Sequence, residues 1–165
     1  MNPYGANTRY YMHTKHLHSI LILVADDDEE DRMLIGEAFE ESRLVNTLHF
    51  VNDGEELMRY LRHEPPYQDQ GKYPTPGLIL LDLNMPKKDG REVIAEMKGD
   101  PRLRAIPVVV LTTSQSEEDI RKTYELGVNS YITKPVTFTS LVELVQTLGK
   151  YWFGIVELPV SLPKK

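Results

Sequence analysis

The chain of 165 residues contains no cysteine, which excludes a disulfide framework, a thiol nucleophile and a cysteine-based zinc site. It has no run of 18 or more apolar residues, so we expect no membrane-spanning helix. The net charge of −6 argues against a nucleic-acid-binding surface as the main feature. Residues 1–18 are polar and lack the apolar segment of a signal peptide. We therefore expect a cytoplasmic protein that binds neither nucleic acid nor membrane.

The length suits one domain with a single core. We expect a mobile N-terminal tail over residues 1–18, one domain over residues 19–150 and a C-terminal extension over residues 151–165. The extension contains Trp152, Phe153 and several aliphatic residues. Because so apolar a segment would not remain in water, we expect it to pack on its own domain or on a partner.

Apolar runs alternate with helical patterns five times along the chain. The runs cover residues 19–24, 47–51, 77–82, 106–111 and 129–133. They are continuous rather than alternating, which is typical of strands buried on both faces of a parallel sheet. Strand–helix alternation of this kind predicts an α/β fold, specifically a flavodoxin-like (βα)5 doubly wound parallel sheet with strand order 2-1-3-4-5.

Polar side chains stand where four of these runs stop. Asp26 and Asp27 follow the first run, Asp82 ends the third, Thr112 follows the fourth and Lys134 follows the fifth. Each has a plainer interpretation when it is considered alone, such as a helix cap, an ordinary strand residue or a surface charge. Because the carboxyl ends of parallel strands share one edge of a sheet, their joint placement predicts a single site.

Six consecutive acids, residues 26–31, extend from the first strand into a helix. We assign Glu29, Glu30 and Asp31 to the helix start, where carboxylates favour the positive end of the helix dipole. Asp26 and Asp27 stand at the strand end itself and would crowd Asp82. Three carboxylates so close need a hard cation, and Mg²⁺ fits because it binds oxygen ligands and retains waters that a phosphoryl group can replace.

These motifs resemble the receiver domain of two-component response regulators. The matching segments are residues 23–27, 82–90, 111–114 and 131–135, within a resemblance that covers roughly residues 19–150. The resemblance implies that Asp82 accepts a phosphoryl group from the phospho-histidine of a sensor kinase. It further implies that Mg²⁺ is held by Asp27, by the Asp82 carboxylate, by the backbone carbonyl of Asn84 and, through water, by Asp26.

The same resemblance assigns the remaining roles. Thr112 would hydrogen-bond the phosphoryl group, Lys134 would pair with it, and Thr112 with Tyr131 would form the conformational switch. Asp82, Lys134 and Thr112 are thus the expected catalytic residues. Since the partner of Lys134 would be absent at rest, we expect its loss to affect signalling more than stability. The family also leads us to expect a cis peptide bond between Lys134 and Pro135.

Three features are similar to the single-domain regulators of phytochrome-type histidine kinases: the long connection over residues 64–76, the stretch 84–91 and the tail 151–159. This narrower resemblance implies a phytochrome-type kinase as partner and a homodimer through the last helix and the extension. The chain would then be a signalling phosphoacceptor, not a turnover enzyme. Aspartyl-phosphate hydrolases use an acid two residues after the nucleophile, where this chain has Asn84. A phosphorylation-independent adaptor with the same fold is the alternative.

Overall fold

The computed structural model describes residues 20–159. Five parallel strands form one sheet in the order β2-β1-β3-β4-β5. The strands are β1 (Leu21–Ala25), β2 (Thr47–Val51), β3 (Leu78–Leu81), β4 (Val108–Thr112) and β5 (Ser130–Thr133). The predicted flavodoxin-like fold is confirmed. The tail expected over residues 1–18, like the last residues of the extension, lies outside the described range.

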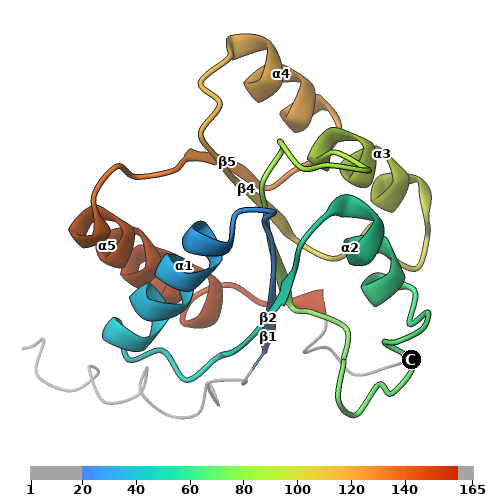
Figure 1. The fold of residues 1–165 in the computed structure, drawn as a ribbon, viewed down its shortest axis with the longest axis horizontal. Coiled ribbons are helices and arrows are strands. Elements are labelled where there is room, and N and C mark those ends of the chain that lie inside the picture. The colour runs from blue at the N-terminus through green and yellow to red at the C-terminus, as the bar shows by residue number, and fades with distance from the viewer. Residues whose placement is uncertain (1–19, 160–165) are drawn as a thin grey trace, which may run out of the picture.

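Helices cover both faces of the sheet (Figure 1). They are α1 (Glu29–Glu41), α2 (Gly54–Leu61), α3 (Gly90–Gly99), α4 (Glu117–Glu125), α5 (Phe138–Leu148) and the short π-helix η1 (Gly149–Phe153). α1 and α5 pack together on one face, and α2 and α3 pack together on the other. Over the part of the chain that is described, no helix combines the length and apolar character needed to cross a membrane.

Successive residues of β1 face opposite cores. Leu21 and Leu23 join the apolar cluster beneath α2 and α3, whereas Ile22 and Val24 join the cluster beneath α1 and α5. Every residue of β1, β3 and β4 is buried, which explains why their sequences are continuously apolar. β2 lies at the edge of the sheet and is half exposed, so its apolar pattern is the weakest.

Each of the five α-helices begins after a side chain that accepts a hydrogen bond from a backbone N–H of the first turn. The capping residues are Asp28, Asp53, Asp89, Ser116 and Thr137. Such a cap stabilises a helix by about 1 kcal/mol. Because each helix follows a strand after a few residues, the caps fix the direction in which the chain leaves the carboxyl edge of the sheet.

Gly90 allows α3 to begin close to the strand that carries Asp82. A Cβ atom at this position would lie 2.6 Å from the Asp82 carbonyl oxygen and 2.8 Å from the Cα atom of Leu83. The Gly90 N–H also donates to the Leu83 carbonyl at 2.8 Å. Any larger residue would push the helix away from the strand end, which gives the Asp89–Gly90 pair a physical reason.

The long connection over residues 64–76 packs on its own domain. The rings of Tyr67 and Tyr73 have centroids 5.0 Å apart, and both rings contact Tyr60 of α2. The Tyr67 hydroxyl donates a hydrogen bond to Glu56 in the first turn of α2. These aromatic contacts account for the length of the connection, because they bury side chains that the sheet and helices alone would leave exposed.

The last helix continues past residue 150. α5 passes directly into η1, so the boundary expected between residues 150 and 151 falls within a helical segment. Trp152 and Leu158 are only 7% and 5% exposed and join the core beneath α1 and α5. Tyr151 and Ile155 are 52% and 66% exposed. The extension therefore packs partly on its own domain and leaves part of its apolar surface uncovered.

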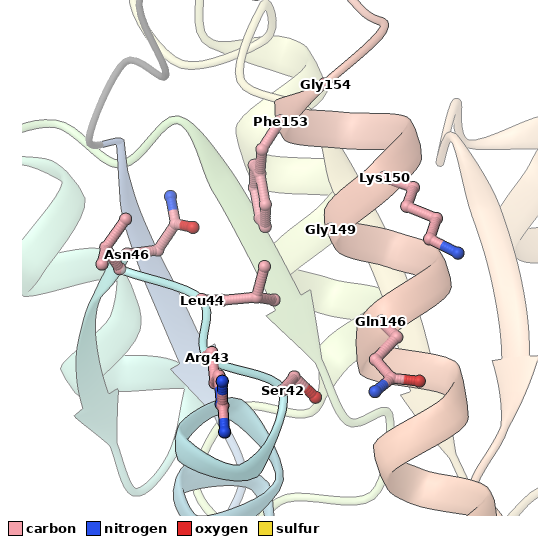
Figure 2. Close-up of a pocket in the computed structure, with 10 residues that line it drawn as sticks. Ser42, Arg43, Leu44, Asn46, Gln146, Gly149, Lys150, Phe153 and Gly154 are labelled. Carbon is pink, nitrogen blue, oxygen red and sulfur yellow. The ribbon is translucent and has the colours of Figure 1, made fainter.

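The start of η1 lies against the loop that follows α1 (Figure 2). A Cβ atom at Gly149 would lie 2.8 Å from a methyl carbon of Leu44, so glycine permits this close contact. A surface pocket of about 480 Å³ opens beside it, with Arg43, Lys150 and Phe153 among the lining residues.

Candidate functional site

The sheet brings four predicted residues to one edge. Asp26 follows β1, Asp82 follows β3, Thr112 ends β4 and Lys134 follows β5. The backbone N–H of Asp82 donates to Ala25 at 2.9 Å, and the N–H of Lys134 donates to Thr112 at 2.8 Å, so the ladders extend to the site itself. The expectation that parallel strand ends would assemble these side chains is confirmed by their contacts.

Lys134 lies at the centre of the site. Its Nζ atom donates to Asp26 Oδ2 at 2.7 Å, to Asp31 Oδ2 at 2.6 Å and to Asp82 Oδ2 at 3.0 Å. The lysine side chain is 12% exposed. Burial acts to lower the pKa of the ammonium, but the hydrogen bonds to Asp26 and Asp31 outweigh burial and hold the pKa above its ordinary value. Lys134 is therefore charged at every physiological pH.

Asp82 is buried, with its two oxygens in different surroundings. Oδ1 accepts a hydrogen bond from the Thr112 hydroxyl at 2.8 Å and from the Asn84 N–H at 3.2 Å. Oδ2 accepts from Lys134. Thr112 is completely buried, so its hydroxyl is directed to Asp82 by the packing of β4. The carboxylate is thus held between a hydroxyl and an ammonium, the two groups that we expected to contact a phosphoryl group at this position.

Three carboxylates converge beside Lys134. Oxygen atoms of Asp26, Asp27 and Asp82 lie within 4.8 Å of one another. Asp26 and Asp82 are buried, whereas Asp27 is exposed. Burial raises the pKa of the Asp26 carboxyl and outweighs the opposing effect of its hydrogen bond with Lys134. An open, oxygen-rich cluster of this kind has the ligand chemistry of a site for a hard divalent cation.

Asp31 is the site residue that the sequence interpretation missed. We assigned it to the helix start, and its backbone N–H does donate a hydrogen bond to the capping carboxylate of Asp28. Its carboxylate, however, makes the shortest of the three Lys134 contacts. Asp31 lies in the first turn of α1, and the direction of its side chain depends on how that helix leaves β1, so the sequence carried no signal that singled it out.

Tyr131 lies at the rim of the site and is half buried against the core beneath α2 and α3. Its hydroxyl donates to the backbone carbonyl of Ser114 at 2.8 Å. The Ser114 hydroxyl donates to Asp119 at 2.7 Å, and Asp119 pairs with Arg91 of α3 at 2.6 Å. The loop between β4 and α4 is therefore tied both to Tyr131 and to α3.

Two expectations about Lys134 are wrong. We expected its partner to be absent at rest, but three carboxylates already pair with it because the acids of β1, α1 and β3 all face its ammonium. We also expected a cis Lys134–Pro135 bond. Across residues 20–159 the cis peptide bond is Pro65–Pro66, so Lys134–Pro135 adopts the trans form that X–Pro bonds intrinsically favour.

Comparison with known proteins agrees with the geometry of the site. The response regulator receiver domain family matches residues 22–146. The response regulator Rcp1 of Synechocystis sp. is 43% identical over 141 residues, covering 86% of this chain and 94% of Rcp1. The crystal structure of the phosphorylated cyanobacterial phytochrome response regulator RcpA is 46% identical, with a TM-score of 0.79, and covers 85% of this chain and 98% of RcpA.

A second solved structure is similar, the Mn²⁺-bound form of Rcp1. It is 44% identical with a TM-score of 0.77, covering 85% of this chain and 99% of that one. The family match covers all five strands except Leu21, the first residue of β1, and it includes the side chains gathered around Asp82 and Lys134. The chain therefore belongs to the response regulator receiver family.

Proposed function

We propose that the chain accepts a phosphoryl group on Asp82 from the phospho-histidine of a sensor histidine kinase, and that the modified domain then acts through altered protein contacts. The observation that carries this proposal is the environment of the Asp82 carboxylate. It is buried, it faces the Lys134 ammonium at 3.0 Å and the Thr112 hydroxyl at 2.8 Å, and it borders an open acidic cluster. Such a site suits the transfer of an anionic group to an oxygen nucleophile.

Each side chain has a role in this reaction. An Asp82 oxygen attacks phosphorus as the P–N bond to the donor histidine breaks, and the leaving imidazole takes up a proton. Phosphoryl transfer needs positioning and positive charge more than covalent help, because charge spreads over the equatorial oxygens. Lys134 supplies one positive charge, and two unit charges about 4 Å apart near a surface attract by roughly 4 kcal/mol. The Thr112 hydroxyl is placed to donate a hydrogen bond to the transferred group.

We assign a Mg²⁺ site to Asp27, Asp82, the backbone carbonyl of Asn84 and, through water, Asp26. The convergence of three carboxylates supports this assignment, as does the Mn²⁺-bound form of the similar protein Rcp1. A bound divalent ion would supply positive charge for the phosphoryl oxygens. Asp27 is the exposed member of the trio and is therefore free to take an ion from solvent.

Millimolar Mg²⁺ should raise the melting temperature of the protein, because an ion bound only by the folded state stabilises it. At one hundred times the dissociation constant the gain is about 2.7 kcal/mol. The Asp27→Asn variant should lose most of this gain, as measured by thermal unfolding in chelator and in Mg²⁺. Glu30→Gln removes an equal charge from an exposed residue nearby and should keep the full response. A full response in Asp27→Asn would remove Asp27 from the ligand set.

Thr112 and Tyr131 form the proposed switch. The Thr112 hydroxyl already points at Asp82, and Tyr131 is already half buried with its hydroxyl on Ser114. Phosphorylation would replace the Asp82 acceptor of Thr112 with a phosphoryl oxygen and thereby stabilise this arrangement. A pair of states a few kcal/mol apart is sufficient for such a population shift.

A phytochrome-type histidine kinase is the partner that we propose. The similarity to phytochrome response regulators over most of both chains supports it. Because a kinase makes its phospho-histidine from ATP, the proposal also places the chain in the cytoplasm. The test is phosphoryl transfer from a panel of radiolabelled histidine kinases that includes phytochrome-type members. Rapid transfer from a phytochrome-type kinase would support the proposal, and transfer from none would favour a phosphorylation-independent adaptor.

We also propose a homodimer through α5 and the extension. Tyr151 is half exposed on η1, and Gly149, Lys150 and Phe153 of the same helix line the pocket that also includes Leu44 (Figure 2). A symmetric dimer would cover this apolar surface with the same surface of a second copy. Truncation after Lys150 is not a clean test, because it would remove Trp152 and Leu158 from the core.

A charge at Tyr151 should prevent this association without disturbing the fold. We expect Tyr151→Arg to sediment as a monomer at concentrations where the wild type is a dimer, because an unpaired charge would be buried in the interface. Met33→Arg introduces the same charge at an exposed apolar position on α1 and should leave the dimer intact. A wild type that stays monomeric at high micromolar concentration, phosphorylated or not, would disprove the dimer.

A further inference from the structure

Asp31 competes with Asp82 for the same ammonium. Lys134 Nζ lies 2.6 Å from Asp31 Oδ2 and 3.0 Å from Asp82 Oδ2, so the contact with the proposed phosphoacceptor is the longer one. The Asp31 side chain is 35% exposed, whereas that of Asp82 is 9% exposed. Asp31 is thus the outermost partner of Lys134 and belongs to a helix, whereas Asp26 and Asp82 belong to strand ends.

The position of Asp31 is fixed by the local structure of α1. Its backbone N–H is held by the Asp28 cap at 3.1 Å, and Lys134 follows β5 at the edge of the same site. Both residues also line a cavity of about 70 Å³ beneath Phe138 and Leu141. The helix dipole favours an acid in the first turn, but it does not require that acid to contact a lysine 103 positions away in the sequence.

We propose that Asp31 is a positioning residue that restrains Lys134 at rest and so slows the phosphorylation of Asp82. The inference rests on the proposed function of Asp82. In the reaction, an Asp82 oxygen forms a bond to phosphorus while the bond from phosphorus to the donor nitrogen breaks, and the donor nitrogen leaves with a proton. Lys134 must turn toward the incoming phosphoryl oxygens, and to do so it must release or share its contact with Asp31.

Two electrostatic effects of Asp31 act in the same direction. Its carboxylate holds the ammonium, and its own negative charge opposes the approach of an anionic phosphoryl donor. With Asp26, Asp27 and Asp82 it brings the site to four carboxylates around one ammonium. Replacing Asp31 by Asn therefore frees Lys134 and removes one repulsive charge, while it keeps the size of the side chain.

The test compares Asp31→Asn, Asp31→Glu and Glu30→Gln with the wild type in the full chain. Phosphoramidate serves as a small donor with Mg²⁺, so that no kinase surface is involved. Asp31→Asn should be phosphorylated about two- to fivefold faster, in line with the energy of a partly exposed ion pair. Asp31→Glu keeps a carboxylate within reach of Lys134 and should resemble the wild type. Glu30→Gln removes the same charge from the same helical turn without touching Lys134 and should also be unchanged.

A second readout does not depend on phosphorylation. The Lys134 ammonium can be observed by NMR in protein labelled with ¹⁵N-lysine. The spectrum of the wild type is compared with that of Asp31→Asn. We expect the Lys134 signal to shift or broaden in Asp31→Asn, because this variant loses the direct contact. In Glu30→Gln the signal should keep its wild-type position and width. If the wild type takes up no phosphoryl group, the proposed function fails, whereas this signal still reports on the contact itself.

The outcomes separate cleanly once circular dichroism shows that the variants are folded. Faster phosphorylation in Asp31→Asn alone, with a changed Lys134 signal, supports the restraining role. Equal rates in Asp31→Asn and Glu30→Gln overturn it and leave Asp31 as a helix-start residue. Slower phosphorylation in Asp31→Asn also overturns it, because Asp31 would then be orienting Lys134 for the reaction.

Discussion

The Asp82→Asn variant should take up no phosphoryl group from any phospho-histidine donor that labels the wild type. An amide oxygen is not a nucleophile, and within residues 20–159 no other carboxylate contacts both the Thr112 hydroxyl and the Lys134 ammonium. The fold should survive, because the Asn oxygen can still accept the Thr112 hydrogen bond. In metal-free buffer the variant should be more stable by about 1 kcal/mol, since one of the converging carboxylates is removed.

The control for this variant is Asp100→Asn, which neutralises an acid that pairs with Arg102 at the end of α3, away from the site. It should be labelled like the wild type. Labelling of Asp82→Asn at the wild-type rate would show that a different residue accepts the phosphoryl group. A lower denaturation midpoint for Asp82→Asn in chelator would argue that Asp82 is not part of a repulsive cluster.

Lys134→Ala should be strongly destabilised in metal-free buffer, by about 3 kcal/mol. Removing the ammonium leaves the buried carboxylates of Asp26 and Asp82 without their cation, and uncompensated buried charge is costly. Urea denaturation at neutral pH measures the loss directly. Millimolar Mg²⁺ should restore part of the lost stability, because a cation bound by the carboxylates would replace the missing charge.

The loss of stability in Lys134→Ala should become smaller as the pH falls. The pKa of Asp26 is already raised by burial, and loss of Lys134 would raise it further. A carboxyl with a raised folded-state pKa destabilises the protein above that pKa, and protonation removes this cost as the pH falls through it. The difference in the free energy of unfolding between Lys134→Ala and the wild type should therefore be smaller under mildly acidic conditions.

Lys122→Ala is the matched control for this lysine. Lys122 pairs with Glu118 on the exposed surface of α4, where solvent screens the ion pair and its contribution to stability is small. A stability loss in Lys134→Ala no larger than that of Lys122→Ala would contradict the buried network around Lys134. It would instead support the expectation that loss of Lys134 affects signalling more than stability.

The placement of Asp26, Asp82, Thr112 and Lys134 could be predicted because parallel topology alone determines it. Each follows or ends an apolar strand, and the carboxyl ends of parallel strands meet at one edge whatever the details of packing. Two helix starts follow from residue type in the same local way, because Asp and Ser favour the N-cap position, and Asp53 and Ser116 occupy it in the structure. Both features depend only on the pattern of apolar residues and on where each strand or helix begins and ends.

Asp31 could not be placed in the same way. Within a run of six acids, the sequence does not show which carboxylate turns back toward the sheet, because that depends on the angle at which α1 leaves β1.

The burial of Trp152 and Leu158 was equally hard to predict. Their apolar character required burial, but the choice between their own core and a partner depended on the path of η1 after Lys150.

Asp82 is the residue that we propose carries the phosphoryl group, and this can be tested chemically. Borohydride reduces an aspartyl phosphate to homoserine, so treatment of the phosphorylated chain followed by peptide mass spectrometry locates the acceptor. We expect homoserine at position 82 and unmodified aspartate at positions 26, 27 and 31, because among these four carboxylates Asp82 lies between the Thr112 hydroxyl and the Lys134 ammonium. Homoserine at another position, with residue 82 still aspartate, would contradict the account.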